Sequence, residues 1–522
     1  MRHRSFQRHL LCLVIGSQLL GCTSSVMGAG TTPDGWPTPT PQPEPYQPAF
    51  SAVVAQPNFQ APSAQHCARP IRTRDIPGRA ANAAAGVDAW PAPMADATGG
   101  LRKERAPAAA AKLEAAAPAF IPPPDIMASA APPPPPASVA SPALAREAKV
   151  AQATSDRASP VPQTLMPRHR PAPQQQSMQV TAGVVDDNAS FADYLAFRQR
   201  TQVAHKARDI DERYLLQVRD AAGRGVPDAE VRIQSTNGSA MWARTDTTGR
   251  VWVSPNAFDS SRASTYQVSV RKPGRGGLAQ ATGFLQRGQK SAVDITLNAG
   301  APQRAQLDLV FLVDATGSMD DEIYKLKATL RTIAQDVARL PAQPDLCFAL
   351  VSYRDKGDAY LVRSHDFTND LNAFQGVLNQ LQAAGGGDYP EAMNEALVEA
   401  VHHLSWRGTG TTRMVFLLAD APPHLDYSGP QYDDSMVAAL GKGIKIFGVG
   451  ASGLDKQGEY IQRQIAQYTG GKFVFLTYDQ ASNPASGPGR ETVHDVQNYS
   501  VDSLDRLIVR LVREDLAALA TL

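Results

Sequence analysis

The chain has 522 residues, of which 41 are proline and 39 are glycine, and its 51 Lys and Arg against 50 Asp and Glu leave a net charge of +1. This balance excludes a protein that binds nucleic acid through bulk positive charge, and four cysteines exclude a scaffold built from disulfides. Of the 41 prolines, 29 fall between Thr31 and Val180, and a stretch so rich in proline cannot build a regular core. The globular part is therefore expected in roughly the last 330 residues, enough for two domains.

Residues 1–21 have the pattern of a secretion signal. A basic start is followed by an apolar run, Leu10–Leu20, that is too short to span a bilayer comfortably. The run ends in Leu-Leu-Gly-Cys at Cys22, which resembles the lipobox of bacterial lipoproteins. The resemblance implies cleavage before Cys22, acylation of that cysteine and a stable membrane anchor, and Thr23 after it favours the outer membrane. An ordinary secretory signal with an incidental cysteine is the alternative.

Residues 22–190 are expected to form a disordered Pro/Ala-rich linker. The unbroken run Pro132–Pro136 is typical of polyproline II mixed with coil. Such a tract would hold the folded domains at one end away from the bilayer that carries the lipid anchor at the other end. Once Cys12 leaves with the signal, Cys67 lies in this linker and Cys347 in a predicted strand. We predict no structural disulfide between them.

Residues 191–300 are expected to form a small β domain. An amphipathic stretch at Phe191–Arg198 precedes about six short strands between Tyr214 and Leu297, separated by turn signals. This spacing favours a small antiparallel β-sandwich. The segment 217–253 resembles the carboxypeptidase-regulatory, transthyretin-like modules of secreted bacterial proteins. It contains no cluster of acid, base or nucleophile, so we interpret the domain as structural.

Residues 304–522 are expected to form an α/β domain with a doubly wound, mostly parallel sheet. The apolar runs Leu307–Val313, Met414–Ala419 and Ile444–Val449 predict buried parallel strands, and helical patterns lie between and after them. Asp314 and Asp420 stand just past the carboxyl ends of two of these strands. Open α/β sheets place their ligands there.

Three separated loops offer oxygen ligands for one hard cation. The loop after the first strand supplies a carboxylate and two hydroxyls, and a glycine-rich loop at 385–391 supplies two more carboxylates. Since these ligands include neither Cys nor His, they favour Mg²⁺, with Mn²⁺ or Ca²⁺ as substitutes, over zinc or copper. The candidate metal ligands are Asp314, Thr316, Ser318, Asp388, Glu391 and Asp420.

The motifs DATGS, GGGDYPEA and LLADAPPH, in this order, resemble those of von Willebrand factor A-type domains. The resemblance covers about Arg304 to Leu522, and the D-x-P-E loop is similar to that of integrin β-type and hemicentin-like domains. In such domains the three loops form a metal-ion-dependent adhesion site (MIDAS), which implies the six ligands above but leaves open whether Asp388 or Glu391 touches the metal. Arg354 and Asp355 are expected to form a surface ion pair. His424 is expected at the surface or behind the ligands.

The predicted site would bind rather than catalyse. A cation held largely by hydroxyls and water-linked carboxylates can accept an Asp or Glu side chain from a partner protein. We therefore expect a non-enzymatic, membrane-anchored envelope lipoprotein that binds a protein through its metal. One alternative is a metal-dependent hydrolase with His424 or Glu391 as base. Another is an envelope scaffold whose metal site is not functional.

Overall fold

The computed structural model describes residues 67, 71–78, 179–274, 277–299, 305–387 and 389–520. The predicted signal peptide, Cys22, most of the Pro/Ala-rich linker and Asp388 lie outside these described residues.

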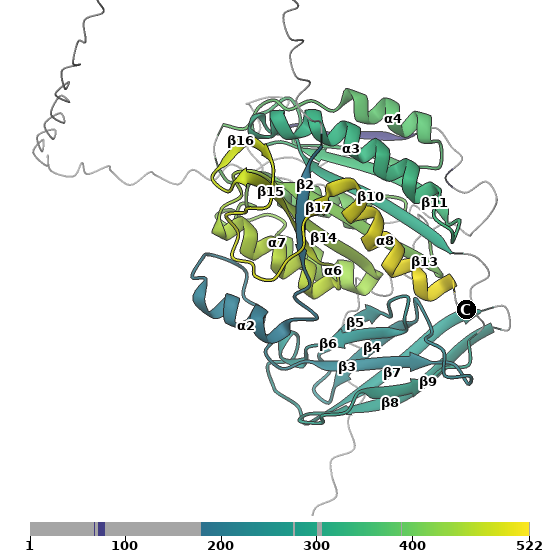
Figure 1. The fold of residues 1–522 in the computed structure, drawn as a ribbon. Coiled ribbons are helices and arrows are strands. Elements are labelled where there is room, and N and C mark those ends of the chain that lie inside the picture. Colours follow the sequence, from purple (N-terminus) through teal and green to yellow (C-terminus); the bar gives the residue numbers. More distant parts are fainter. Residues whose placement is uncertain are drawn as a thin grey trace, which may run out of the picture. The chain divides into compact units, whose positions relative to one another are not determined.

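A ten-stranded sheet forms the centre of the C-terminal domain (Figure 1). Its strands are β1 (Thr73–Ile76), β2 (Thr181–Val185), β10 (Gln306–Asp314), β11 (Asp345–Tyr353), β12 (Val362–Thr368), β13 (Thr411–Ala419), β14 (Ile444–Gly450), β15 (Phe473–Gln480), β16 (Asn483–Pro488) and β17 (Asp502–Ser503). They lie in the order β1-β12-β11-β10-β13-β14-β15-β2-β17, and β16 pairs with β15. From β11 to β15 neighbouring strands are parallel, and the outer pairings are antiparallel. The predicted α/β class is confirmed, but the sheet is mixed and not mostly parallel, because the added edge strands all pair antiparallel.

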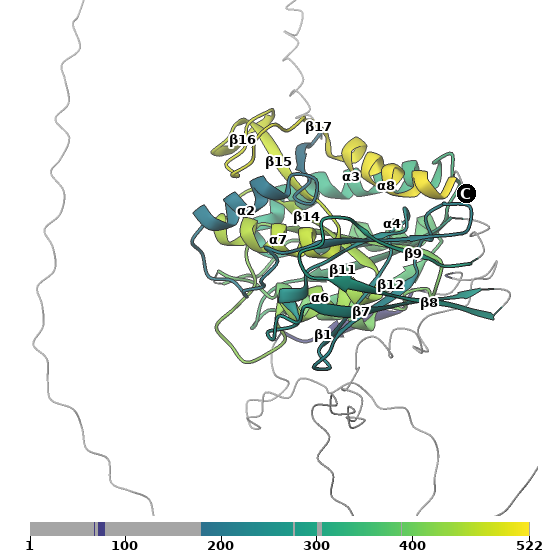
Figure 2. The same cartoon turned by 90° about the horizontal axis from the view of Figure 1, so that it is seen from below.

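Helices cover both faces of this sheet. They are α3 (Asp320–Ala338), α4 (Leu371–Gln380), α5 (Met393–Val398), α6 (Tyr432–Lys442), α7 (Lys456–Thr469) and α8 (Leu504–Ala520), with short helical turns η2 (Gly317–Met319) and η3 (Glu399–His403). α3, α4 and α8 pack on one face, and α5, α6 and α7 pack on the other. Figure 2 shows α3 and α8 side by side, with α6 away from them. Along β10, Leu309 and Phe311 enter the first core while Val310 and Leu312 enter the second. This alternation explains why the strand reads as one continuous apolar run.

Both edges of the sheet are closed by segments from the predicted linker. β1 pairs with β12 at one edge, and β2 pairs with β15 near the other. Cys67 forms a disulfide with Cys347 in β11. The prediction of no bridge is therefore wrong, and so is the prediction of disorder for residues 71–78 and 179–190. Strands of four or five residues, far from their partners in sequence, carry too weak a periodic signal to be recognised.

Helix α2 (Phe191–Arg200) also belongs with the α/β domain and not with the β domain. Its Phe197 ring lies 5.8 Å from the ring of Tyr460 in α7, and the Arg463 guanidinium lies 3.7 Å from the same Phe197 ring. The amphipathic stretch was correctly predicted, but its apolar face is buried against α7. The β domain therefore begins after this helix.

The β domain consists of two sheets around one core. Its elements are β3 (Tyr214–Arg219), β4 (Glu230–Ser235), β5 (Ala240–Arg244), β6 (Arg250–Val253), the turn η1 (Pro255–Ala257), β7 (Thr265–Gly274), β8 (Gly277–Gln286) and β9 (Val293–Thr296). The sheets have the orders β6-β3-β9 and β5-β4-β7-β8, and apolar side chains of both enter the same cluster. β3 and β9 are parallel, which differs from the purely antiparallel arrangement that we predict from the sequence.

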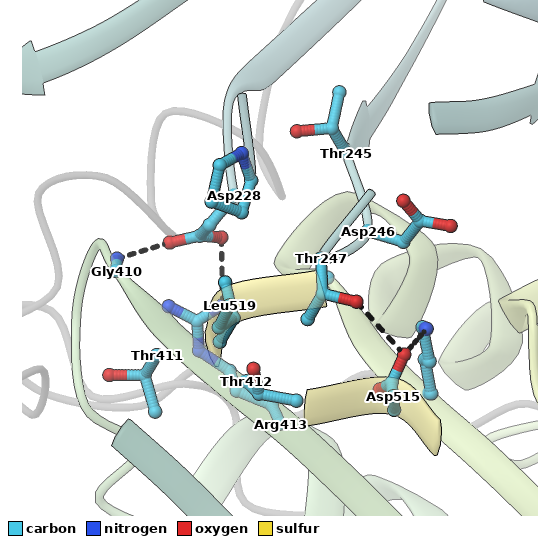
Figure 3. A pocket seen from close by; sticks show the side chains of 13 residues that line it. Asp228, Thr245, Asp246, Thr247, Gly410, Thr411, Thr412, Arg413, Asp515 and Leu519 are labelled. Carbon is cyan, nitrogen blue, oxygen red and sulfur yellow. Dashed lines mark hydrogen bonds and ion pairs between the residues drawn. The ribbon is translucent and has the colours of Figure 1, made fainter. Parts of the chain in front are cut away.

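A buried ion cluster joins the β domain to the α/β domain. Asp228 contacts the Arg244 guanidinium at 2.5 Å and that of Arg413, at the start of β13, at 3.1 Å. A small cavity of about 30 Å³ lies beside this cluster (Figure 3). On its far side Thr247 donates a hydrogen bond to Asp515 of α8, which also pairs with Lys445. The β domain is thus attached to the end of the sheet where β13 begins.

Candidate metal centre

The first loop is ordered by its own side chains. Asp314 is the last residue of β10 and is fully buried. Its Oδ1 accepts hydrogen bonds from the Thr316 amide at 3.0 Å and from the Thr316 hydroxyl at 2.7 Å. The Thr316 and Ser318 hydroxyl oxygens lie 3.2 Å apart, and Ser318 is exposed. The loop therefore holds one carboxylate and two hydroxyls together where β10 ends and α3 begins.

The second loop is bonded directly to the first. The Gly317 amide donates to the Gly385 carbonyl at 3.0 Å, and the Ala384 amide donates to the Ala315 carbonyl at 3.1 Å. A Cβ atom on Gly386 would lie 2.9 Å from Glu391 Oε1 and 3.0 Å from Thr316 Cβ. Glycine is needed there, since its φ is +70° and the space is already filled. Glu391 and Thr316 therefore both lie against this glycine.

The third loop meets the second at Glu391. The Glu391 amide donates to the Pro422 carbonyl at 3.1 Å, and Glu391 pairs with Pro423 in a parallel bridge. Asp420, directly after β13, is buried, and β13 is the neighbour of β10 in the sheet. The structure thus brings together five of the six predicted ligands: Asp314, Thr316, Ser318, Glu391 and Asp420.

Three carboxylates at this place each carry one buried oxygen that lacks a hydrogen-bond partner among the described residues. These atoms are Asp314 Oδ2, Glu391 Oε2 and Asp420 Oδ1. The buried Tyr353 hydroxyl is near Asp314, but it does not reach hydrogen-bonding geometry with Oδ2. Buried carboxylate oxygens are normally satisfied, so three together are consistent with a cation as the missing partner.

The raised pKa values of these carboxylates are also consistent with a cation as the missing partner. Burial, and then the neighbouring Asp420 carboxylate, raise the pKa of Asp314 to about 7. Burial, followed by Asp314 and Asp355, raises the pKa of Glu391 to about 9, and burial also raises the pKa of Asp420. In the metal-free protein these groups resist ionisation because like charges meet in a place poor in water. A bound dication would reverse this preference.

The donor set fits a hard cation held partly through water. Asp314, Glu391 and Asp420 do not all bring an oxygen within 4.8 Å of one another. Among the described residues, the one trio of Cys, His, Asp or Glu that does so is Cys67, Asp308 and Cys347, in which both sulfurs belong to the disulfide. A site that combines hydroxyl ligands with more distant carboxylates suits Mg²⁺, which usually keeps several waters.

Behind the site, His424 and Asp355 are buried partners. His424 Nε2 lies 3.2 Å from Asp355 Oδ1, and His424 Nδ1 lies 3.2 Å from Asp426 Oδ1. Arg354 instead donates to the Gln382 carbonyl at 3.0 Å. The predicted surface pair of Arg354 and Asp355 is wrong, because Asp355 is only 2% exposed. Two side chains 69 residues apart give no local pattern that could have predicted their contact.

Comparison with known proteins identifies this domain. Residues 308–431 match the family described as the von Willebrand factor A domain. The chain contains a von Willebrand factor A (vWA) domain. The matched range includes all six predicted ligands, and the sheet with its helices continues beyond this range through α8.

Two relatives illustrate how local this similarity is. The chain is 29% identical over 144 residues to the alpha-protein kinase vwkA of Dictyostelium discoideum, which covers 27% of this chain and 22% of that protein. It is 33% identical over 115 residues to the von Willebrand factor A domain-containing protein 7 of Homo sapiens, covering 22% of this chain and 12% of that protein. The chain therefore spans less than a quarter of the length of these relatives.

A solved structure is also similar in part. Proximal thread matrix protein 1 from the mussel byssus is 14% identical and covers 32% of this chain and 46% of that chain, with a TM-score of 0.23.

Within the described ranges, no helix is both long and apolar enough to cross a membrane.

Proposed function

We propose that this chain is an envelope lipoprotein whose vWA domain binds a protein partner through a divalent cation. The observation that carries the proposal is that Asp314, Glu391 and Asp420, one from each of the three loops, each have a buried carboxylate oxygen without a hydrogen-bond partner among the described residues. The first of these loops also carries the Thr316 and Ser318 hydroxyls. Those hydroxyls, with Asp314, Glu391 and Asp420, would hold the ion. Asp388 is a further candidate from the second loop.

The recognition chemistry follows from this donor set. A bound Mg²⁺ would supply a positive charge with a coordination position open to an Asp or Glu carboxylate of the partner. Ser318 is exposed, so the partner can approach from its side of the loop. Asp314 and Asp420, both buried, compensate the charge of the ion without blocking that side. Binding should therefore depend on the metal.

The disulfide and the N-terminal motif support a location in the cell envelope. A Cys67–Cys347 bridge is expected in an oxidising compartment and not in a bacterial cytosol. The lipobox-like sequence at Cys22 provides the route to such a compartment and a membrane anchor. Labelling with palmitate that disappears in a Cys22→Ala variant would support the anchor, and equal labelling of both proteins would contradict it.

We also propose that the site binds without catalysis. The two ring nitrogens of His424 lie against Asp355 and Asp426, so this histidine is not placed to activate a water molecule. Glu391 is one of the predicted ligands, so with an ion bound its carboxylate would serve to hold the ion and not to take a proton from water.

The test is affinity capture from envelope extract with the full chain as bait. Wild type should capture its partner in Mg²⁺ and lose it in EDTA, and Asp314→Asn should capture nothing in either condition. Asp321→Asn is the matched control, because Asp321 is an exposed carboxylate in the first turn of α3 that is not a predicted ligand. Capture that survives both EDTA and Asp314→Asn would contradict the metal-dependent mechanism and favour a scaffold.

A further inference from the structure

The N-terminal strap, defined as Cys67 with residues 71–78, ends close to the metal centre. The carbonyl of Gly78 accepts a hydrogen bond from the Gly357 amide at 2.8 Å. A Cβ atom on Gly78 would lie only 2.5 Å from the Asp358 carbonyl oxygen. The strap therefore lies directly against the short loop 354–361 between β11 and β12.

The strap is fixed to the vWA domain along its length. Besides the disulfide and the pairing of β1 with β12, Arg74 contacts the buried Glu399 carboxylate at 2.8 Å. Asp75 pairs with Arg363 through two hydrogen bonds of 2.8 and 2.7 Å. An element held at so many points can fix the position of what it touches.

Asp358 connects this loop to the glycine-rich loop of the metal centre. Its Oδ2 accepts hydrogen bonds from the Gly386 amide at 2.9 Å and from the Asp355 amide at 3.1 Å. A Cβ atom on Gly385 would lie 2.2 Å from Asp358 Oδ1, so the glycine backbone rests on this carboxylate. Gly386 in turn lies against both Thr316 and Glu391. A shift of Asp358 would therefore move the backbone against which two predicted metal ligands pack.

We propose that the N-terminal strap, acting through Asp358, positions the glycine-rich loop for metal binding, and that Asp358 is a positioning residue. This inference rests on the proposed function. The strap lies about 240 positions before Asp314 in the sequence, and on this proposal it helps to position the candidate metal centre. Groups that orient metal ligands without touching the ion are commonly worth 10- to 100-fold in metal affinity.

Two kinds of substitution distinguish an effect of the loop's position from an effect of the Asp358 charge. Asp358→Ala removes the acceptor of the Gly386 amide, whereas Asp358→Asn keeps an oxygen that can accept the same bonds. Gly78→Ala changes no charge but forces the strap and the loop apart. Gly376→Ala is its control, since a Cβ atom there meets nothing within 4 Å.

The experiment titrates the full chain with Mn²⁺ and measures free ion by electron paramagnetic resonance. Asp358→Ala and Gly78→Ala should each bind Mn²⁺ about 10-fold more weakly than wild type, whereas Asp358→Asn and Gly376→Ala should stay within about two-fold. Hydrogen exchange in EDTA gives a readout without metal: the Gly386 amide should exchange faster in Asp358→Ala than in Asp358→Asn. Melting curves confirm that each variant is folded.

The outcomes distinguish the two claims. If wild type binds no Mn²⁺, the proposed function fails and the inference fails with it. If wild type binds Mn²⁺ and both Gly78→Ala and Asp358→Ala bind it equally well, the inference alone is overturned. Equal losses in Asp358→Ala and Asp358→Asn, with Gly78→Ala unchanged, would show an effect of charge and would also overturn it.

Discussion

The buried carboxylate of Asp314, a predicted metal ligand, destabilises the metal-free fold. It is fully buried, and the nearby Asp420 carboxylate adds repulsion, so its pKa is raised to about 7. The side chain nevertheless accepts two hydrogen bonds from Thr316, so its orientation is kept. A residue that costs stability while its geometry is maintained is typical of a functional site.

Replacing Asp314 with Asn should therefore have opposite effects with and without metal. In EDTA at pH 8, Asp314→Asn should raise the free energy of unfolding by roughly 2 kcal/mol, because an ionised buried carboxylate is replaced by a neutral amide of the same shape. Adding Mg²⁺ should stabilise wild type and leave the variant unchanged. Chemical denaturation measures both effects. A variant that is less stable than wild type in EDTA would contradict the electrostatic argument.

The pH dependence has a definite sign. In the metal-free protein the pKa of Asp314 rises from 3.8 to about 7 on folding, so the folded state binds the extra proton. This contribution to stability is complete below about pH 4 and is lost as the pH rises through about 7. Mg²⁺ must displace that proton, so its affinity should fall as the pH drops below 7. Calorimetry in two buffers of different ionisation enthalpy should detect proton release at pH 6.5, and a buffer-independent heat would contradict it.

At the scale of elements, the disulfide between Cys67 and Cys347 holds the strand at one edge of the sheet. It closes a loop of 280 residues, for which the chain-entropy estimate is a stabilisation of about 5 kcal/mol. A dithiol reductant, or Cys67→Ser, should therefore lower the melting temperature by several degrees. The ion pairs of Arg74 and Asp75 remain, so β1 should weaken without complete loss of the fold. An unchanged melting temperature under full reduction would contradict this role.

Some elements could be predicted because their signals are local. β10 is apolar throughout, and α3 begins with three acidic residues before an apolar face, so both were placed correctly. The first and third loops of the candidate metal centre directly follow β10 and β13. These loops lie close together because β10 and β13 are neighbouring parallel strands. The edge strands, the disulfide and the contact of His424 with Asp355 join residues far apart in sequence. Their patterns carry no periodicity that would identify the partner.

At the scale of the whole molecule, the β domain is tied to the vWA domain by buried charges. The Arg244 and Arg413 side chains that contact Asp228 are 3% and 2% exposed. Burial alone would raise the pKa of Asp228, but the two guanidinium groups outweigh it and lower the pKa to about 2. The stabilisation is present above pH 3.8 and is lost as the pH falls through about 2.

Removing Asp228 should test this attachment. Asp228→Ala removes the carboxylate that the two buried guanidinium groups share, while Arg244 keeps its contact with Glu230 at 3.7 Å, and should cost about 3–5 kcal/mol of unfolding free energy. Asp294→Ala is the control, because its pair with Arg219 is exposed and 3.9 Å long, and it should change stability by less than about 1 kcal/mol. Equal effects of the two substitutions in urea denaturation would contradict the claim that this buried ion cluster holds the two domains together.

The positions of the edge strands β1 and β2 also change which part of the predicted linker separates Cys22 from the folded domain. Because β1 and β2 lie seven strand spacings apart in the sheet order, residues 79–178 connect two sides of the same domain, roughly 34 Å apart. On the proposed anchor at Cys22, only the 45 residues to Cys67 separate the membrane from the fold.

Whether a cation binds among the three loops can be seen directly. Crystals of the full chain grown with Mn²⁺ and measured at the manganese absorption edge should show one anomalous peak between Ser318, Asp314 and Asp420, and Asp314→Asn should remove it. A well-ordered site without a peak, or a peak only at unrelated surface carboxylates, would contradict the metal-dependent account.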